Sequence, residues 1–367
     1  MRGLYVHIPF CIKKCAYCDF VSYENCFNLE NDYINALKKE FCHYKGEAVD
    51  TVFIGGGTPT ALKTESLTLL LDAIFENFEV LKNAEITVEC NPKTADRKKL
   101  SALVKHGVNR LSIGVQSLDD NILKTVGRAH SSTDAKNIIY DANEVGFKNI
   151  SADIMFGLPG QTVKILEKTI DELCKMPLSH ISCYGLILEE GTPLYKKVNK
   201  GELSLPDEDT EFKMYESAVL RLKEHGFNRY EISNFAKENK YSFHNIKYWE
   251  CEEYIGCGAA AHSYYNGERF SRTEKLSDYI KNPLEKADAV TLTEDDKKSE
   301  FMMLGLRMDK GILTHEYKKR FLEDPIEKYK KIIEKYEKAE LLVCDGKRIY
   351  LTDKGIYLSN TVLCEFM

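Results

Sequence analysis

The stretch Cys11-Ile12-Lys13-Lys14-Cys15-Ala16-Tyr17-Cys18 decides the fold of this chain. It follows the apolar run at residues 3–10, so its three cysteines lie on a short loop that leaves a predicted strand. Thiolates spaced C-x3-C-x2-C on such a loop can converge on one metal centre. A 4Fe-4S cluster usually takes four cysteine ligands, so three cysteines leave one iron open for a small molecule. The spacing favours an iron-sulfur site that takes part in chemistry.

A structural zinc knuckle is the alternative interpretation of the same cysteines. Such a site needs a fourth ligand close by. Asp19 and Phe20 follow the triplet, and His7 lies upstream on an alternating strand, where it can be a core or rim residue. Counting ligands therefore favours the iron-sulfur site.

The composition is that of an ordinary globular protein, with 367 residues, 43% hydrophobic and 29% charged. The length suits a core of barrel size with an appendage. A net charge of −6 argues against a broad nucleic-acid footprint. No apolar run reaches the ~20 residues that cross a bilayer, and the chain starts on a strand without a signal peptide. The 12 cysteines fit a reducing compartment better than a disulfide framework, so we expect a cytoplasmic protein.

Short apolar runs alternate with helical patterns along the first half of the chain. The six predicted strands are residues 4–8, 51–54, 86–90, 110–115, 150–155 and 180–184. Amphipathic segments such as 30–44 and 163–175 separate them, which indicates βα repeats and a parallel sheet. Right-handed crossovers would wind six such units into an α/β fold, an incomplete (β/α)6 barrel. Periodicity alone does not separate this barrel from an open doubly wound sheet.

Five of the six predicted strands end in polar or glycine-rich motifs. Parallel α/β folds bind ligands at the C-terminal ends of their strands, so these motifs should meet at one rim. The motifs are the cysteine loop, Gly55-Gly56-Gly57-Thr58-Pro59-Thr60, Glu89 before Asn91-Pro92, Gly114-Val115-Gln116-Ser117, and Asp153 before Gly157-Leu158-Pro159-Gly160-Gln161-Thr162.

Two features of this rim point to a charged ligand. The glycine triplet lets the backbone approach a ligand closely, which suits the amino-acid end of a sulfonium cofactor; a plain strand-to-helix turn is the alternative. Glu89 and Asp153 lie on otherwise apolar strands, where burial without a partner is costly. A ribose diol or a sulfonium would supply that partner, and an ion pair with a Lys or Arg of the barrel is the alternative.

The cysteine spacing and the glycine motif resemble those of the radical S-adenosylmethionine (radical SAM) superfamily. That resemblance implies that S-adenosylmethionine chelates the open iron and is cleaved by an electron from the cluster to a 5′-deoxyadenosyl radical. Residues 5–11, Arg128-Ala129-His130, Gly157-Leu158-Pro159 and the C-terminal region further resemble the oxygen-independent coproporphyrinogen III oxidase family. By this resemblance Cys11, Cys15 and Cys18 hold the cluster. The cofactor-binding positions it implies are Tyr5, Gly56, Gly57, Thr58, Glu89, Gln116, Arg128, Asp153 and Ile187, with Tyr17 beside the adenine.

Residues 187–271 are interpreted as a connector built on the barrel. Two strand-like stretches, 229–235 and 254–263, flank the motif His244-Asn245-Ile246-Lys247-Tyr248-Trp249. His244, Tyr248 and the single tryptophan can form an aromatic pocket with one axial ligand for a flat macrocycle. A histidine that only packs beside aromatic rings is the alternative.

The composition shifts towards charged helices after Lys275. Predicted helices at 294–308 and 325–340, a hairpin at 341–351 with an Asp-Gly turn and a short helix at 352–358 indicate a winged-helix-like domain. The predicted domains are a partial barrel at 1–190, the connector with its histidine motif at 191–285, and the C-terminal domain at 286–367.

Two departures separate this chain from the coproporphyrinogen dehydrogenases. Phe20 stands where those enzymes have a further cysteine, and only four residues precede Tyr5 in place of a substrate-enclosing extension. These departures and the His244–Trp249 motif resemble the HemW haem-chaperone branch. The resemblance implies haem as cargo with His244 as its candidate ligand, haem-requiring respiratory proteins at the membrane as acceptors, a reductant such as ferredoxin or flavodoxin, and a homodimer.

Three functions therefore remain open from the sequence. Haem binding and delivery is favoured. A coproporphyrinogen III dehydrogenase that decarboxylates propionates by radical chemistry is second, because of the two departures. A radical enzyme acting on RNA is third, because the acidic balance opposes nucleic-acid binding.

Overall fold

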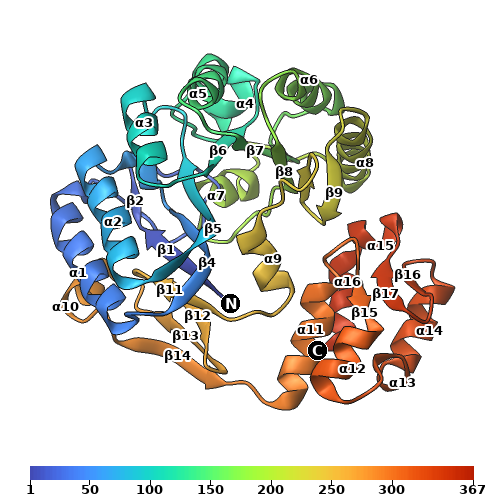
Figure 1. The fold of residues 1–367 in the computed structure, drawn as a ribbon. Helices are drawn as coiled ribbons and strands as arrows, with labels where there is room; N and C mark the ends of the chain where they lie inside the picture. Colours follow the sequence, from blue (N-terminus) through green and yellow to red (C-terminus); the bar gives the residue numbers. More distant parts are fainter.

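The six predicted strands form the parallel centre of one sheet in the computed structural model, which describes residues 1–367 (Figure 1). They are β1 (Arg2–Ile8), β4 (Ala48–Gly56), β5 (Glu79–Cys90), β6 (Arg110–Gln116), β7 (Asn149–Phe156) and β8 (His180–Gly185). Each strand pairs with the next in the same direction. The C-terminal ends of all six consequently lie at one rim.

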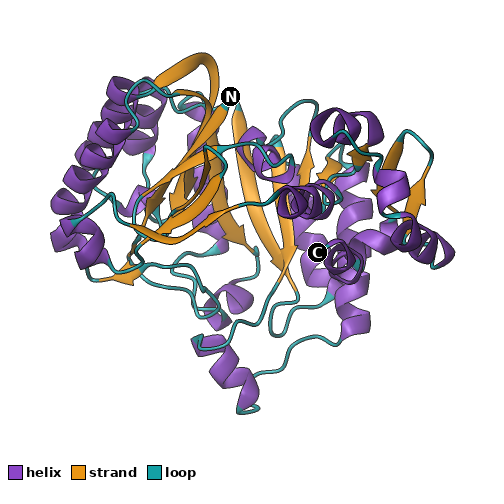
Figure 2. Ribbon diagram, turned by 90° about the horizontal axis from the view of Figure 1, so that it is seen from below, coloured by secondary structure: helices purple, strands orange, loops and turns teal.

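Helices cover the outside of this curved sheet, while the strands line its inside (Figure 2). The connecting helices are α1 (Glu30–His43), α2 (Thr64–Asn77), α3 (Arg97–Lys105), α4 (Asp120–Thr125), α5 (Ser132–Glu144) and α6 (Val163–Cys174). Their apolar faces pack on the strands; Leu166, Ile170 and Leu173 of α6 are fully buried. This arrangement confirms the predicted incomplete (β/α)6 barrel.

The sheet extends at both ends with strands from the connector. On the β1 side β11 (Tyr254–Cys257) is parallel and is followed by antiparallel β12 (His262–Tyr265), β13 (Glu268–Arg272) and β14 (Lys286–Thr291). On the β8 side lie β10 (Asn234–Ala236) and β9 (Asn228–Glu231). The sequence pattern does not predict β13 and β14, because both are rich in charged or small residues and β14 forms the exposed edge.

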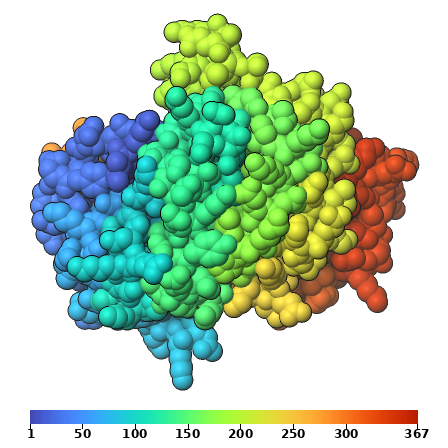
Figure 3. Space-filling model, turned by 90° about the horizontal axis from the view of Figure 1, so that it is seen from above, coloured from blue at the N-terminus to red at the C-terminus, as the bar shows by residue number.

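Four helices complete the connector. Three are short, namely α7 (Pro193–Asn199), α9 (Phe243–Trp249) and α10 (Leu276–Lys281), and α8 (Glu208–Glu224) has 17 residues. Helix α7 protrudes from the body of the molecule, in the yellow-green knob of Figure 3. Helix α9 carries the histidine motif and lies at the open side of the sheet, where it contacts β4 and α11 (Glu294–Gly305).

The C-terminal region combines helices with a small sheet of order β15-β17-β16. Its elements after α11 are β15 (Ile312–Leu313), α12 (Thr314–Phe321), α13 (Pro325–Lys328), α14 (Lys330–Lys338), β16 (Leu342–Cys344), β17 (Arg348–Leu351), α15 (Asp353–Tyr357) and α16 (Ser359–Leu363). The predicted hairpin forms. The single helix predicted at 325–340 is wrong in detail, because the chain breaks at Tyr329 into two shorter helices.

Two further minor elements matter for the site. Strand β2 (Phe10–Cys11) continues from β1 and pairs with β3 (Tyr23–Glu24), so the cysteine loop is closed at its base.

All 12 cysteines are free of disulfide bonds. None of the helices combines the length and the apolar character needed to span a membrane.

Candidate cofactor site

One cavity at the C-terminal rim collects the motifs from five strand ends. Eleven of the predicted site residues line it, namely Cys11, Cys15, Tyr17, Cys18, Gly56, Gly57, Thr58, Glu89, Gln116, Arg128 and Asp153. The fold thus brings together residues that are up to 142 positions apart, from Cys11 to Asp153, as the strand-end motifs predicted. Three predicted residues, Tyr5, Ile187 and His244, do not line this cavity.

The three cysteines share one wall of the cavity. The sulfur of Cys11 lies 3.6 Å from Thr58 Oγ1, and Arg128 Nη1 donates to the sulfur of Cys15 at 3.2 Å. Nowhere in the chain do three His, Cys, Asp or Glu side chains converge closely enough to hold a single metal ion. In a 4Fe-4S cluster the cysteines bind different iron atoms, which suits three sulfurs that line one cavity.

The glycine loop lies directly against the cysteine loop. A Cβ atom at Gly57 would lie 2.8 Å from the carbonyl oxygen of Phe10 and 3.1 Å from the sulfur of Cys11. Gly56 adopts a φ of +108°, in the region that side chains rarely enter. The close approach of the two loops therefore requires glycine at both positions, and both glycines line the cavity.

Two carboxylates face the cavity and form no ion pair there. Glu89 Oε2 accepts the backbone N–H of Gly56 at 3.0 Å, and Asp153 accepts from Ser112 Oγ at 3.1 Å. The ion pair of the barrel arginine Arg110 is with Glu85 instead, at 3.9 Å. Burial, together with the nearby charge of Asp153, raises the pKa of Glu89 to about 8. Buried carboxylates in this state suit a cationic or hydroxyl-bearing ligand.

Gln116 and Arg128 form a further part of the cavity wall. Gln116 ends β6 at a register shift and has a φ of +65°, a strained conformation for a side-chain-bearing residue. Its Oε1 atom accepts from Tyr184 Oη at 3.2 Å. Arg128 Nη2 donates to Asn91 Oδ1 and to the carbonyl oxygen of Gly114. The guanidinium therefore joins the cysteine loop to the ends of β5 and β6.

The predicted rim motif at Asn91 does line the same cavity, but two further lining residues, Ser112 and Tyr184, were not predicted. Tyr184 ends a predicted strand, so the strand-end rule could have found it. Ser112 is two residues before Gly114 on the same face of β6, because side chains alternate along a strand.

Tyr5 and Ile187 lie apart from the cavity. Tyr5 Oη is 2.9 Å from His7 Nδ1, and the Tyr5 ring packs against Phe53. Ile187 follows β8 in a loop, with 71% of its surface exposed. Neither residue lines the cavity, so the cofactor roles of Tyr5 and Ile187 stay predictions.

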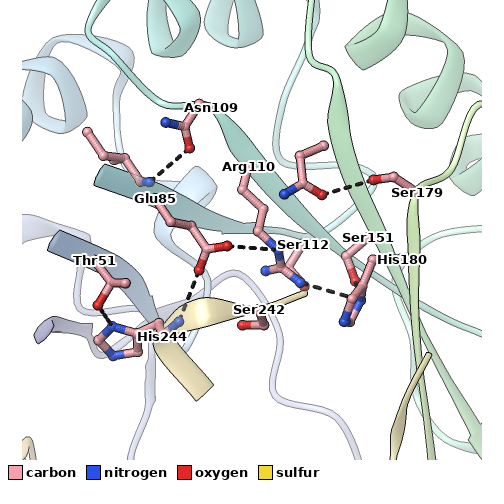
Figure 4. A network of polar contacts seen from close by, with 12 residues as sticks. Thr51, Glu85, Asn109, Arg110, Ser112, Ser151, Ser179, His180, Ser242 and His244 are labelled. Atoms are coloured by element: carbon pink, nitrogen blue, oxygen red, sulfur yellow. Dashed lines mark hydrogen bonds and ion pairs between the residues drawn. The ribbon is translucent and has the colours of Figure 1, made fainter. Parts of the chain in front are cut away.

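His244 is not open to a ligand in this structure. Its Nδ1 lies 2.9 Å from Thr51 Oγ1 and its Nε2 lies 2.8 Å from Tyr248 Oη. The ring stacks on Phe53 and is 1% exposed, inside the polar network of Figure 4. Burial lowers the pKa of His244 to about 3. The structure thus favours the packing interpretation, because iron ligation would need one of these hydrogen bonds to break.

Comparison with known proteins agrees with the geometry. Residues 5–173 match the radical SAM superfamily, and residues 292–358 match the HemN C-terminal domain. The "Heme chaperone HemW" of Bacillus subtilis is 37% identical over 100% of this chain and 99% of its own length. That of Lactococcus lactis is 36% identical over 100% and 97%. "Radical S-adenosyl methionine domain-containing protein 1, mitochondrial" of Danio rerio is 34% identical over 98% and 86%.

One solved structure shares the whole architecture. The coproporphyrinogen III oxidase HemN of Escherichia coli, described as a radical SAM enzyme, superposes with a TM-score of 0.86 over 99% of this chain and 89% of that chain. The sequences are 22% identical. At this level the likeness concerns the fold alone.

Proposed function

Because the chain belongs to the HemW family of the radical SAM superfamily, we propose that it binds haem and delivers it to haem-requiring proteins. The observation that carries this proposal is the full-length similarity to haem chaperones. The position after the cysteine triplet supports it, because Phe20 supplies no further thiol there.

The cofactors of this family are a 4Fe-4S cluster and S-adenosylmethionine, and the cavity fits both. Cys11, Cys15 and Cys18 would hold the cluster. When bound, the cluster supplies an electron and S-adenosylmethionine offers a sulfonium that accepts it. Glu89 and Asp153 would bind the cationic and hydroxyl groups of the cofactor, and Gly56 and Gly57 would let its amino-acid end approach. Arg128 positions the loop of Cys15.

Replacing one cysteine tests the cluster assignment. Cys15→Ser should lower the iron and sulfide content of anaerobically reconstituted protein several-fold, while Cys26→Ser, outside the triplet, should retain it. Zinc in place of iron after expression in iron-replete medium would contradict the assignment.

Haem transfer tests the function itself. Cluster-containing protein should bind haem saturably under anaerobic conditions and restore activity to a haem-depleted respiratory enzyme. The same preparation, incubated with coproporphyrinogen III, S-adenosylmethionine and a reductant, should form no protoporphyrinogen. Protoporphyrinogen at enzyme-like turnover would instead establish the dehydrogenase.

The finer partners follow from the same family membership. We propose haem-requiring respiratory proteins at the membrane as acceptors, ferredoxin or flavodoxin as reductant, a cytoplasmic place of action and a homodimer. Light scattering of the purified protein checks the dimer, and reduction of the cluster by each electron carrier checks the reductant.

A further inference from the structure

A second cavity adjoins the cofactor cavity at Phe20, whose side chain lines both. Its volume is about 610 Å³, within the range of about 300–1,000 Å³ that holds cofactor-sized ligands. The walls come from β1, α9, the β11–β12 turn and Leu304 of α11. The cavity therefore opens between the barrel and the C-terminal region, beside the cysteine loop.

Aromatic rings dominate this cavity. Tyr5, Tyr248, Trp249, Tyr254 and Tyr264 line it. The rings of Tyr248 and Tyr254 meet edge to face, with centroids 4.6 Å apart. The buried Nε1 atom of Trp249 has no hydrogen-bond partner. A wall of this kind suits a large flat π-system, which stacks on aromatic faces and edges.

Three histidines lie around the cavity, and two of them are already engaged. His7 contacts Tyr5 Oη through Nδ1 at 2.9 Å and the carbonyl oxygen of Val21 through Nε2 at 2.8 Å. His244 packs behind Tyr248, with both ring nitrogens bonded. His262 lines the cavity, is exposed, and makes no side-chain hydrogen bond. Its imidazole is the one that can ligate a metal without losing an existing partner.

The backbone holds His262 at this place. A Cβ at Gly256 would lie 1.9 Å from the carbonyl oxygen of His262, and one at Gly258 would lie 2.6 Å from that of His7. The turn between β11 and β12 also places Ala260 at a φ of +61°. Such a tight turn is sustained only by strong surrounding contacts, and it directs the start of β12 towards the cavity.

The charged residues that line the cavity restrict how many acidic groups its ligand can carry. Arg269 is its cation; Glu300 accepts from Nη1 at 2.6 Å and from Nη2 at 3.1 Å, while the buried Nε has no partner. Asp19, Glu252 and Glu274 also line the cavity. These carboxylates disfavour a ligand with many acidic groups. Haem carries fewer carboxylates than coproporphyrinogen, so it fits this balance better.

We propose that haem binds in this second cavity with His262 as axial ligand, stacked against the aromatic wall and next to the cluster loop at Phe20. The proposal rests on the haem-carrier function proposed above and specifies where the cargo sits. The positive charge of Arg269, whose two Nη atoms are bound to Glu300, favours a haem propionate on this side. Tyr248 and Trp249 contribute to the wall, and His244 supports them from behind.

The test is an anaerobic haem titration of the full-length, cluster-containing protein, followed by Soret absorbance and resonance Raman spectroscopy. His262→Gly should weaken haem binding at least tenfold and remove the histidine-ligated spectrum, and added imidazole should restore it. His315→Ala, an exposed histidine on α12, is the matched control and should bind haem as the wild type does. Iron content of the cluster should be equal in all variants.

The outcomes separate this site from the carrier function. If His262→Gly binds haem as tightly as the wild type and with the same spectrum, the proposed site is wrong and the carrier function stands. The same holds if the spectrum changes only in His244→Gln. Loss in His262→Gly without rescue by imidazole would also overturn ligation by His262. Absence of saturable binding in the wild type would overturn the carrier function itself.

Discussion

The backbone N–H of His244 donates to Oε1 of Glu85 at 3.1 Å, inside the curved sheet (Figure 4). Glu85 also faces Arg110, whose Nη2 atom lies 3.4 Å from His180 Nδ1. On the same helix start, the N–H of Ser242 donates to Tyr230 Oη at 3.0 Å. The buried network therefore fastens the first turn of α9 to β5 and β6. Through α9 it sets the position of the aromatic wall.

Glu85→Ala should loosen α9 without disturbing the cofactor cavity. The change leaves the N–H of His244 and the guanidinium of Arg110 without their acceptor, at a cost of about 1–3 kcal/mol in the free energy of unfolding. Hydrogen exchange of the amides in 243–249 should become faster. Glu79→Ala, at the exposed start of β5, is the control. Equal protection of α9 in both variants would show that Glu85 does not anchor it.

The stability of the protein should carry a pH dependence that comes from His244. Its pKa is about 3 when folded, whereas the unfolded chain has a histidine pKa near 6.5. The unfolded state binds the extra proton as pH falls, so this contribution is intact above about pH 6.5 and is lost below it. His244→Gln should remove up to about 1.4 kcal/mol per pH unit from the slope of unfolding free energy between pH 7 and 5.

Urea unfolding at several pH values measures that slope. His43→Gln, on the exposed side of α1, should leave it as in the wild type. If both variants show the same slope, His244 is either protonated in the fold or released from its hydrogen bonds.

S-adenosylmethionine should bind more tightly as pH rises from 7 to 9. Burial holds the pKa of Glu89 at about 8 without ligand, and a cationic partner requires the ionised carboxylate, so at lower pH a proton must first leave. Glu89→Gln should bind about tenfold more weakly, equivalent to about 1.4 kcal/mol, and should lose this pH dependence. Calorimetry on cluster-containing protein checks both effects. Glu76→Gln, at an exposed position of α2, should bind S-adenosylmethionine as the wild type does. If Glu89→Gln also behaves as the wild type, Glu89 does not bind the cofactor.

A buried ion pair supports the β11–β12 turn. Arg272 Nε donates to Glu40 Oε1 at 2.6 Å, and the other carboxylate oxygen accepts the N–H of Gly258 at 2.9 Å. Arg272→Met should cost about 3–5 kcal/mol, because it leaves a buried carboxylate uncompensated. The double variant Glu40→Gln/Arg272→Met should recover part of that loss. Thermal unfolding compares the wild type, Arg272→Met and the double variant. If Arg272→Met is as stable as the wild type, the ion pair does not support the turn.

The sequence determined the fold and the cofactor cavity through local signals. The period of apolar residues marked six strands, and the rule that parallel strands present ligand sites at their C-terminal ends placed ten of the predicted residues at one rim. Arg128 was added by the family resemblance. It could not mark β13 and β14, whose pairing comes from neighbouring strands rather than from their own polar composition.

Only the tertiary structure decided what the histidines can do. The sequence presents His244 as a candidate haem ligand. In the structure its side chain is hydrogen-bonded to Thr51, 193 positions away, and its backbone N–H to Glu85, 159 positions away. His262 carried no motif, and a tight turn against β1 places it, unbonded, in the second cavity. Strand patterns act over a few residues and can be read from sequence. The solvent exposure and hydrogen bonds of a single side chain depend on distant segments that meet only when the sheet curls.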